Sequence, residues 1–496
     1  MALPGQKLAR STCLVLCAAV LPFLAGPAAG QESDLPDIGS PSDAVLSKQQ
    51  ERQIGGAIFR SLRATGNLVE DPEVNEYIQD VGQKLVANAQ DGSFKFRFFV
   101  VNEPTINAFA LPGGYIGVHS GLIQATQSES ELAGVLAHEI SHVTQRHISR
   151  AVYANQRMST VTMATMLGAI LMGVATGSSD AIMGGIAGSQ SIAIQSQINF
   201  TRSNEYEADR VGVGVLARSG FDPQGMPDFF ATLAQQSGPM ASQAPEFLRT
   251  HPVTVNRIAE TRERALEYEV AEVRDATGYT LTRARLTLMS SRTPEKAIER
   301  FEGERDDPDR VGDIGIEYGI ALAKLDMGKA QQAKQAFEGM MQTNPAVINF
   351  HSGLAAAQLA SGQEATALKT YQNAMTLFPR NVPLTIRYAE ALIETGDPNQ
   401  AHEILLDLYN QVPPSPEQVR QIALAAGAAG DTADAHYYMA EYHLLNGDLG
   451  MAADQLRVAL NANELDEVQR ARFTSRLEQV QRAMPPPGSK RRKPGG

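Results

Sequence analysis

The sequence of 496 residues predicts an α+β protein that is mainly helical, in which a domain with a small β-sheet precedes an all-α domain of stacked repeats. Two observations carry this prediction. Aromatic and basic side chains alternate near residue 95 ahead of a Pro-Gly-Gly turn, which is typical of strands. From residue 328 onward, a 34-residue period runs through the chain. A chain of this length also exceeds one ordinary hydrophobic core, so at least two domains are expected.

The N-terminus has the pattern of a secretory signal. Lys7 and Arg10 precede an apolar stretch and a run of small residues, so residues 1–30 are expected to be a signal peptide cut before Gln31. The alternative is a buried or anchoring helix, but the apolar part is short for a membrane span. Both cysteines of the chain lie in this segment, which suits an oxidising compartment.

The charge of the chain bears on its partners. The formal net charge is −12, and removal of the two basic residues of the signal segment makes it −12 − 2 = −14. An acidic chain is a poor non-specific ligand for nucleic acid, so no nucleic-acid partner is expected.

The first domain is expected over residues 49–270. A flexible polar leader (31–48) is expected before it. The predicted elements of the domain, in order, are a helical region (49–90), a strand (94–98), a hairpin (107–111 with 115–118) and an amphipathic helix (129–149). The stretch 159–179 carries no charge, and a second apolar, Gly-rich stretch continues to about residue 198. Both stretches are short for membrane spans, so our hypothesis is a lid or a peripheral, membrane-touching hairpin over 159–198.

The repeat domain is expected over residues 282–482. Gly, Ala and Pro each recur at intervals of 34 residues, at Gly328, Gly362, Gly396 and Gly430, at Ala333, Ala367, Ala401 and Ala435, and at Pro345, Pro379 and Pro413. This period resembles the tetratricopeptide repeat, whose helix pairs must stack into a solenoid to bury their apolar faces. The Pro/Gly-rich basic tail, 483–496, is expected to be disordered.

The strongest chemical signal is His138-Glu139-Ile140-Ser141-His142 on a predicted helix. One helical turn separates the two histidines, so both project from the same face. Two imidazoles on a rigid frame suit tetrahedral zinc with an open position, and Glu139 is placed to act as general base on a water molecule. A chance match is the alternative.

A third ligand is expected from a separate element. The candidate is Glu205, with Asp209 one turn further on as the group that receives a ligand histidine's free N–H. Glu207 is the rival to Glu205, and a solvated acidic helix face is the alternative to both.

The two motifs together resemble the HtpX-like and prenyl-protein-processing zinc metallopeptidases of the gluzincin group, in which H-E-x-x-H is followed by E-x-x-x-D. The resemblance covers roughly residues 50–265 and implies a zincin-type domain that holds one Zn²⁺ per chain, with Glu205 as third ligand and Asp209 behind a histidine.

The same resemblance extends to two further segments. It implies that the edge strand Asn107-Ala108-Phe109-Ala110 pairs with extended substrate, although an ordinary core hairpin is an alternative. It also implies that Arg257 holds a substrate carbonyl or carboxylate, and that His251 either stabilises the oxyanion or fills the fourth zinc position in a resting state. His119, His147 and His351 lack partners in the sequence and are expected to be structural.

These features predict a periplasmic zinc endopeptidase whose repeats bind protein partners. The resemblance implies clients among outer-membrane proteins and their assembly machinery. Two alternatives remain: a chaperone or scaffold with a latent peptidase site, and a membrane-embedded peptidase, which would require 159–198 to span the bilayer.

Overall fold

The computed structural model describes residues 46–89, 94–154, 202–236, 245–269, 276–307, 310, 312–462 and 465–484. The predicted signal segment, most of the leader, the apolar segment 159–198 and nearly all of the tail lie outside the described residues. Within those ranges, no helix combines the length and the apolarity needed to cross a membrane.

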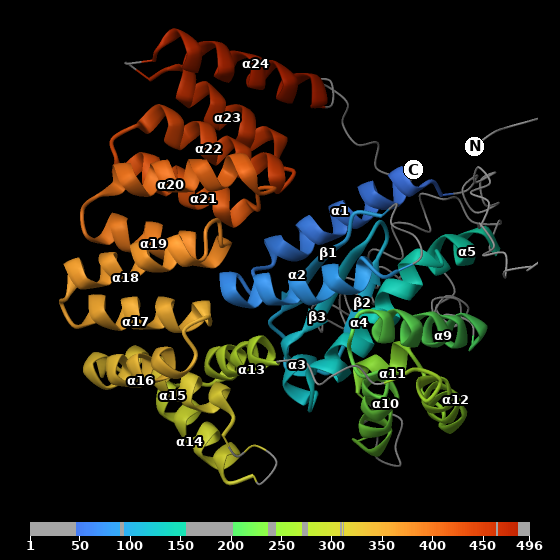
Figure 1. Ribbon diagram of the computed structural model, residues 1–496. Coiled ribbons are helices and arrows are strands. Elements are labelled where there is room, and N and C mark those ends of the chain that lie inside the picture. The colour runs from blue at the N-terminus through green and yellow to red at the C-terminus, as the bar shows by residue number, and fades with distance from the viewer. Residues whose placement is uncertain are drawn as a thin grey trace, which may run out of the picture. The chain divides into compact units, whose positions relative to one another are not determined.

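The first domain is built on a three-stranded sheet (Figure 1). The strands are β1 (Arg97–Val101), β2 (Ala108–Leu111) and β3 (Tyr115–His119), in the order β1-β3-β2, with β1 parallel and β2 antiparallel to β3. The predicted hairpin is therefore present, and Gly113 and Gly114 turn it at φ of 79° and 93°. The predicted strand 94–98 was placed too early, because β1 is covered on both faces and its second half is continuously apolar.

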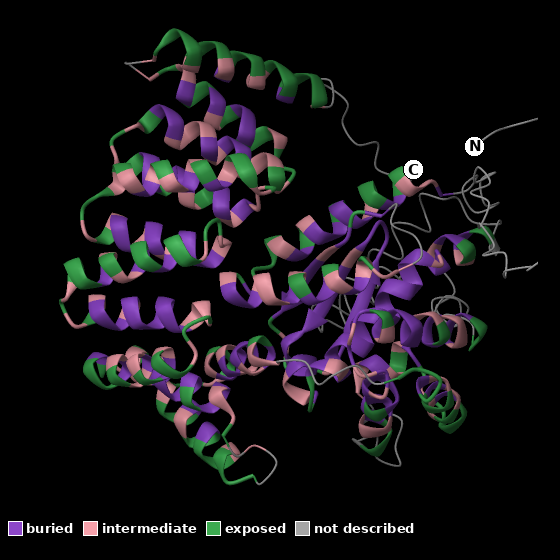
Figure 2. Cartoon of the chain, viewed as in Figure 1, coloured by how far each residue is buried: buried purple, intermediate pink, exposed green. Residues whose placement is uncertain are grey.

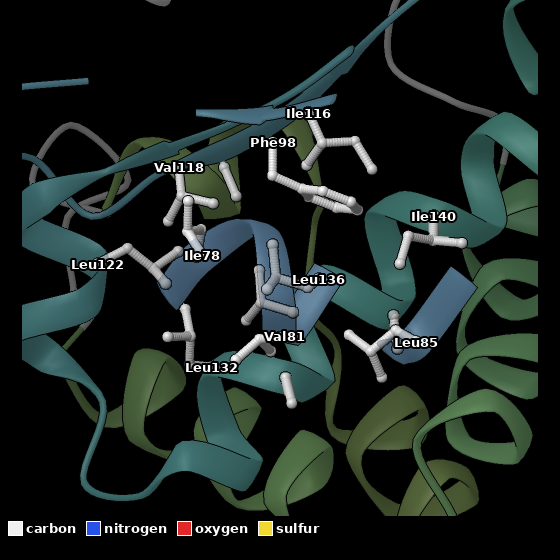
Figure 3. Packing of buried hydrophobic residues seen from close by; sticks show 14 of the residues in the cluster. Ile78, Val81, Leu85, Phe98, Ile116, Val118, Leu122, Leu132, Leu136 and Ile140 are labelled. Carbon is white, nitrogen blue, oxygen red and sulfur yellow. The ribbon is translucent and has the colours of Figure 1, made fainter. Parts of the chain in front are cut away.

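The side chains of the sheet alternate between two helical layers. Helices α2 (Pro72–Val86) and α4 (Glu129–Thr144) cover one face, where Phe98, Ile116 and Val118 pack with Ile78 and Leu136 (Figure 3). On the other face, helix α1 (Lys48–Ala64) packs its own apolar side chains against the alternate strand residues, Phe99, Val101, Phe109 and Leu111. The period of two residues in the strands therefore fixes which side chains face α4.

Helix α4 lies in the middle of this domain and is buried at nearly every residue (Figure 2). Ser128 caps its start by accepting a hydrogen bond from the N–H of Glu131. The predicted helix 129–149 is wrong at its end: α4 stops at Thr144, Arg146 adopts φ of 54°, and a new helix, α5, runs over His147–Ala154. A non-glycine residue in the left-handed region ends a helix sharply, and neither Gly nor Asn marks the position in the sequence.

The remaining helices of the first domain are α3 (Ser120–Ala125), α9 (Arg202–Arg218), α10 (Gly225–Gln236), α11 (Glu246–Thr250) and α12 (Val255–Ala265). Helices α9 and α10 both pack on α4, and α12 packs on both of them. Residues from three helices that are separate in the sequence are thereby gathered around α4.

The repeat domain consists of helix pairs, as predicted. Its helices are α13 (Thr277–Ser290), α14 (Pro294–Arg305), α15 (Ile314–Asp326), α16 (Ala330–Thr343), α17 (Ile348–Ala360), α18 (Glu364–Leu377), α19 (Val382–Glu394), α20 (Pro398–Gln411), α21 (Pro416–Ala428), α22 (Thr432–Leu445), α23 (Leu449–Leu460) and α24 (Glu467–Ala483). The four glycines of the 34-residue period all have φ between 71° and 88°, the conformation that ends each first helix. The first helix begins at Thr277, five residues before the predicted start of the domain at 282.

Candidate metal centre

Two helices that lie against each other supply most of the site. His138 and His142 project from α4, while Glu205 and Asp209 lie one turn apart on α9. The close approach depends on Gly212 of α9: a Cβ at this position would lie 3.2 Å from the backbone nitrogen of His138 and 2.9 Å from the Cε of Met226. A side chain at this position would press on the backbone of α4, so glycine lets α9 present its carboxylates directly to the α4 histidines.

The side chains of the three residues that the sequence offers as metal ligands converge. His138 Nε2 lies 3.0 Å from His142 Nε2, and the two carboxylate oxygens of Glu205 lie 3.6 Å each from one of these nitrogens. His251, which follows α11, joins them, with Nδ1 at 3.2 Å from Glu205 Oε2 and 3.4 Å from His138 Nε2. All four residues are buried, and one atom from each lies within 4.8 Å of every other.

This group of side chains fits a zinc ion. Zinc bound to nitrogen at about 2.0–2.1 Å in a tetrahedron holds its ligand atoms roughly 3.3 Å apart, close to the spacing observed. Among the described residues, the buried Oε1 of Glu205 has no hydrogen-bond partner. A buried, ionised oxygen that faces imidazole nitrogens instead of donors calls for a cation between them.

The electrostatics point the same way. Burial lowers the pKa of His138, but the carboxylates of Asp209 and Glu205 outweigh burial and raise it to about 9. Burial, together with the neighbouring histidines and against the carboxylate of Glu205, lowers the pKa of His142 well below its usual range. The carboxylates around His138 therefore favour a positive charge at this position, and a metal ion supplies such a charge equally well.

Arg257 and Asp209 form a buried pair behind His138. Asp209 Oδ1 lies 2.9 Å from His138 Nδ1, and Arg257 donates to both oxygens of Asp209, at 2.7 and 2.8 Å. Arg257 also lies 3.0 Å from Glu205 and is only 2% exposed. The side chain predicted to meet substrate thus has its donors directed at the two carboxylates of α9, and burial makes this pairing obligatory.

Glu139 lies between the histidines and the sheet edge. Burial raises the pKa of its carboxyl, the pKa change expected of a group that must hold a proton during catalysis. The backbone N–H of Ala110 on the edge strand β2 acts in the opposite direction, and His251 Nε2 lies 3.6 Å from Glu139 Oε1. The motif and the predicted edge strand therefore adjoin each other at Glu139.

Asn107 precedes the edge strand and is fully buried, yet within the described part of the chain neither Oδ1 nor Nδ2 of its amide has a hydrogen-bond partner. Just before it, the carbonyl of Ile106 accepts a hydrogen bond from the N–H of Phe247, whose ring stacks on that of His251 at 4.8 Å. The residue before Asn107, at the start of β2, is thereby hydrogen-bonded to the segment that carries His251.

Of the three histidines that are expected to be structural, His147 lies beside the candidate metal centre. His147 Nδ1 lies 2.8 Å from His142 Nδ1, and its Nε2 lies 3.3 Å from Glu207 Oε2. No pattern in the sequence predicts this contact, because His147 stands five residues after His142 and approaches it only through the helix break at Arg146. His119 and His351 do have local partners, Thr105 Oγ1 and the carbonyl of Pro345, remote from the centre.

The fold and the site together are those of a zinc metallopeptidase domain joined to a helical-repeat domain. Residues 72–265 match peptidase family M48, and residues 358–426 match the tetratricopeptide repeat. A beta-barrel assembly-enhancing protease of Yersinia pestis is 35% identical over 90% of this chain and 92% of its own length. That of Escherichia coli K12 is 32% identical over 96% and 97%. A mitochondrial metalloendopeptidase of Arabidopsis thaliana is 33% identical over 45% of this chain and 43% of its own.

The chain belongs to the beta-barrel assembly-enhancing proteases, a family of M48 peptidases with tetratricopeptide repeats. The predictions of the family, the two-part fold and a zinc metalloendopeptidase are confirmed.

Proposed function

We propose that the chain hydrolyses peptide bonds at a zinc ion held by His138, His142 and Glu205, with Glu139 as general base. The observation that carries this proposal is the convergence of three buried ligand groups beside a buried glutamate, on two helices that touch at Gly212. When bound, zinc supplies Lewis acidity that polarises the scissile carbonyl and activates a water molecule. Glu139 takes a proton from that water and delivers it to the leaving amine.

Asn107 and the edge strand are the proposed substrate-binding elements. Strand β2 is bonded to β3 on one side, so its other side can pair with an extended peptide that runs past Glu139. The amide of Asn107 offers one acceptor and two donors that have no partner among the described residues. Satisfying them with substrate backbone recovers the cost of burying them.

His251 is proposed as a fourth ligand in the conformation described, in preference to an oxyanion donor. Its Nδ1 faces His138 and Glu205, so the ring takes the position where substrate would approach the metal. Arg257 is proposed as a positioning residue for Asp209 and Glu205 instead of a substrate-binding one, because its donors meet these carboxylates.

The test is hydrolysis of an unfolded protein by wild type and Glu139→Gln, each at one zinc per chain. The glutamine keeps the shape and removes the base, so the rate should fall at least about 100-fold. Retention of activity with zinc bound would exclude Glu139 as the base. In the same assay His251→Ala should keep or gain activity, whereas a loss as large as that of Glu139→Gln would assign the oxyanion role instead.

The clients and the cellular location of the enzyme are inferred from the names of its relatives and from its N-terminal sequence. The names of the bacterial relatives refer to β-barrel assembly, and the N-terminal pattern of this chain is that of a signal peptide. We therefore assign the enzyme to the periplasm, where outer-membrane proteins and their assembly machinery would be bound by the repeats. A scaffold with a latent peptidase site is the second candidate, favoured by the extent of the repeat domain.

These two candidates separate in cells that lack the native gene. If Glu139→Gln restores outer-membrane protein assembly fully, the scaffold function dominates; if it does not, proteolysis is required. Fractionation and N-terminal sequencing of the mature protein test the location, and a mature chain that still begins at Met1 would contradict it.

A further inference from the structure

The second ligand histidine has a backing group that the motif does not include. His142 Nδ1 and His147 Nδ1 are 2.8 Å apart, and both side chains are buried. In an unbroken helix, a residue five positions on would be rotated by about 140° from His142 and would face away. The left-handed conformation of Arg146 ends α4 and returns His147 to the ring of His142, with 4.8 Å between centroids.

The contact continues through His147 to an ion pair. His147 Nε2 lies 3.3 Å from Glu207 Oε2, and Arg150 donates to the same oxygen at 2.8 Å. Glu207 stands on α9 two residues after the ligand Glu205, while Arg150 stands on α5 one turn after His147. Glu207, the rival to Glu205 in the sequence, therefore contacts His147 and not the candidate ligand atoms.

The direction of the hydrogen bonds follows from the chemistry of the end group. A carboxylate paired with arginine only accepts, so His147 Nε2 must donate to Glu207. Nδ1 of the neutral His147 ring then accepts, and His142 must carry its proton on Nδ1. That tautomer leaves the lone pair on His142 Nε2, the atom that faces His138 and Glu205.

We propose that His147, Glu207 and Arg150 form a positioning chain that holds His142 in the tautomer and orientation that bind the metal. The two ligand histidines then have matching supports. His138 is backed directly by Asp209 with Arg257, whereas His142 is backed through an interposed imidazole by Glu207 with Arg150. Such hydrogen-bonded supports raise metal affinity typically about 10–100-fold.

The second support ends at the surface. Glu207 and Arg150 are 25% and 45% exposed at their side chains, while Asp209 and Arg257 are fully buried. Substitutions of Glu207 therefore disturb the positioning chain of His147, Glu207 and Arg150 without disturbing the packing of the hydrophobic core. This inference rests on the proposed assignment of His142 as a ligand.

The test is the zinc dissociation constant of the full-length protein, measured by competition with a chromophoric chelator. His147→Leu removes the acceptor and should weaken binding about 10–100-fold. His147→Asn places an oxygen near the position of Nδ1 and should restore affinity to within a few-fold. His351→Leu removes a buried histidine of α17 and should change nothing.

Wild-type affinity in His147→Leu, or equal weakening in the Leu and Asn variants, would overturn the inference. If His147→Leu does not fold, Glu207→Leu takes its place, and an unchanged dissociation constant there would be equally decisive. Unfolding of the metal-free variants shows whether packing has changed. Failure of the wild type itself to bind zinc would instead refute the proposed function.

Discussion

Arg257 shows how much of this site depends on single buried charges. Its guanidinium is 2% exposed, burial works against its charge, and two carboxylates of α9 hold that charge in place. In return, Arg257 and His138 keep the pKa of Asp209 low although burial raises it. Removal of one member would leave the others as uncompensated buried charges.

Arg257→Gln should therefore lower the free energy of unfolding by about 3 kcal/mol or more and weaken zinc binding. Arg262→Gln is the matched control on the same helix: its ion pair with Asp228 is 2.9 Å long, but both side chains are about half exposed. Its loss should cost less than about 1 kcal/mol. Denaturant unfolding with a chelator present measures both, and equal effects would contradict the buried-network account.

At the scale of elements, the site depends on the distance between α4 and α9. Gly212 sets that distance through its contact with the α4 backbone at Ala137 and His138. The carboxylates and the histidines meet because no side chain intervenes.

Gly212→Val should push the helices apart, destabilise the domain by about 1–3 kcal/mol and reduce zinc affinity. Gly303 in α14 is the control, because a Cβ there meets nothing within 4 Å. Gly303→Ala should stabilise by roughly 0.5–1 kcal/mol through helix propensity. Melting temperatures and chelator competition report both quantities, and undiminished zinc affinity in Gly212→Val would refute the spacing argument.

At the scale of the whole molecule, the described part of the chain carries a contact between the two domains at Glu76. Burial raises the pKa of Glu76 to about 7, and Asn381 at the start of α19 donates a hydrogen bond to it at 2.7 Å. The folded state keeps this proton up to about pH 7, whereas the unfolded chain releases it near its ordinary pKa of 4.5. Stability is therefore lost as the pH rises from 4.5 to 7.

Glu76→Gln should melt at a higher temperature than wild type at pH 8, and this gain should shrink toward pH 4.5. After screening by solvent, the difference is on the order of 1 kcal/mol. Glu299→Gln, at a side chain 62% exposed, should show no such pH dependence. A gain for Glu76→Gln that is equal at pH 5 and pH 8 would contradict the assignment.

The sequence sufficed wherever a local period carries the information. Gly328 and its equivalents marked the repeat, and the spacing of His138 and His142 placed both on one helical face. The sequence does not predict contacts between segments that are far apart along the chain. The pairing of Arg257 with Asp209 joins residues 48 positions apart, and no period encodes it. The turn at Arg146 also went unseen, because the residues around it are compatible with a continued helix.

The central claim is that Glu205 completes a zinc site whose chemistry depends on Glu139. The most direct measurement is zinc content and proteolysis after chelator treatment and return of stoichiometric zinc. Wild type and Glu139→Gln should each recover one zinc per chain, with activity only in the wild type. Glu205→Gln should recover neither, while Arg210→Gln, at an exposed position five residues further along the same helix, should regain both. Zinc retained by Glu205→Gln, or activity in Glu139→Gln, would contradict the account.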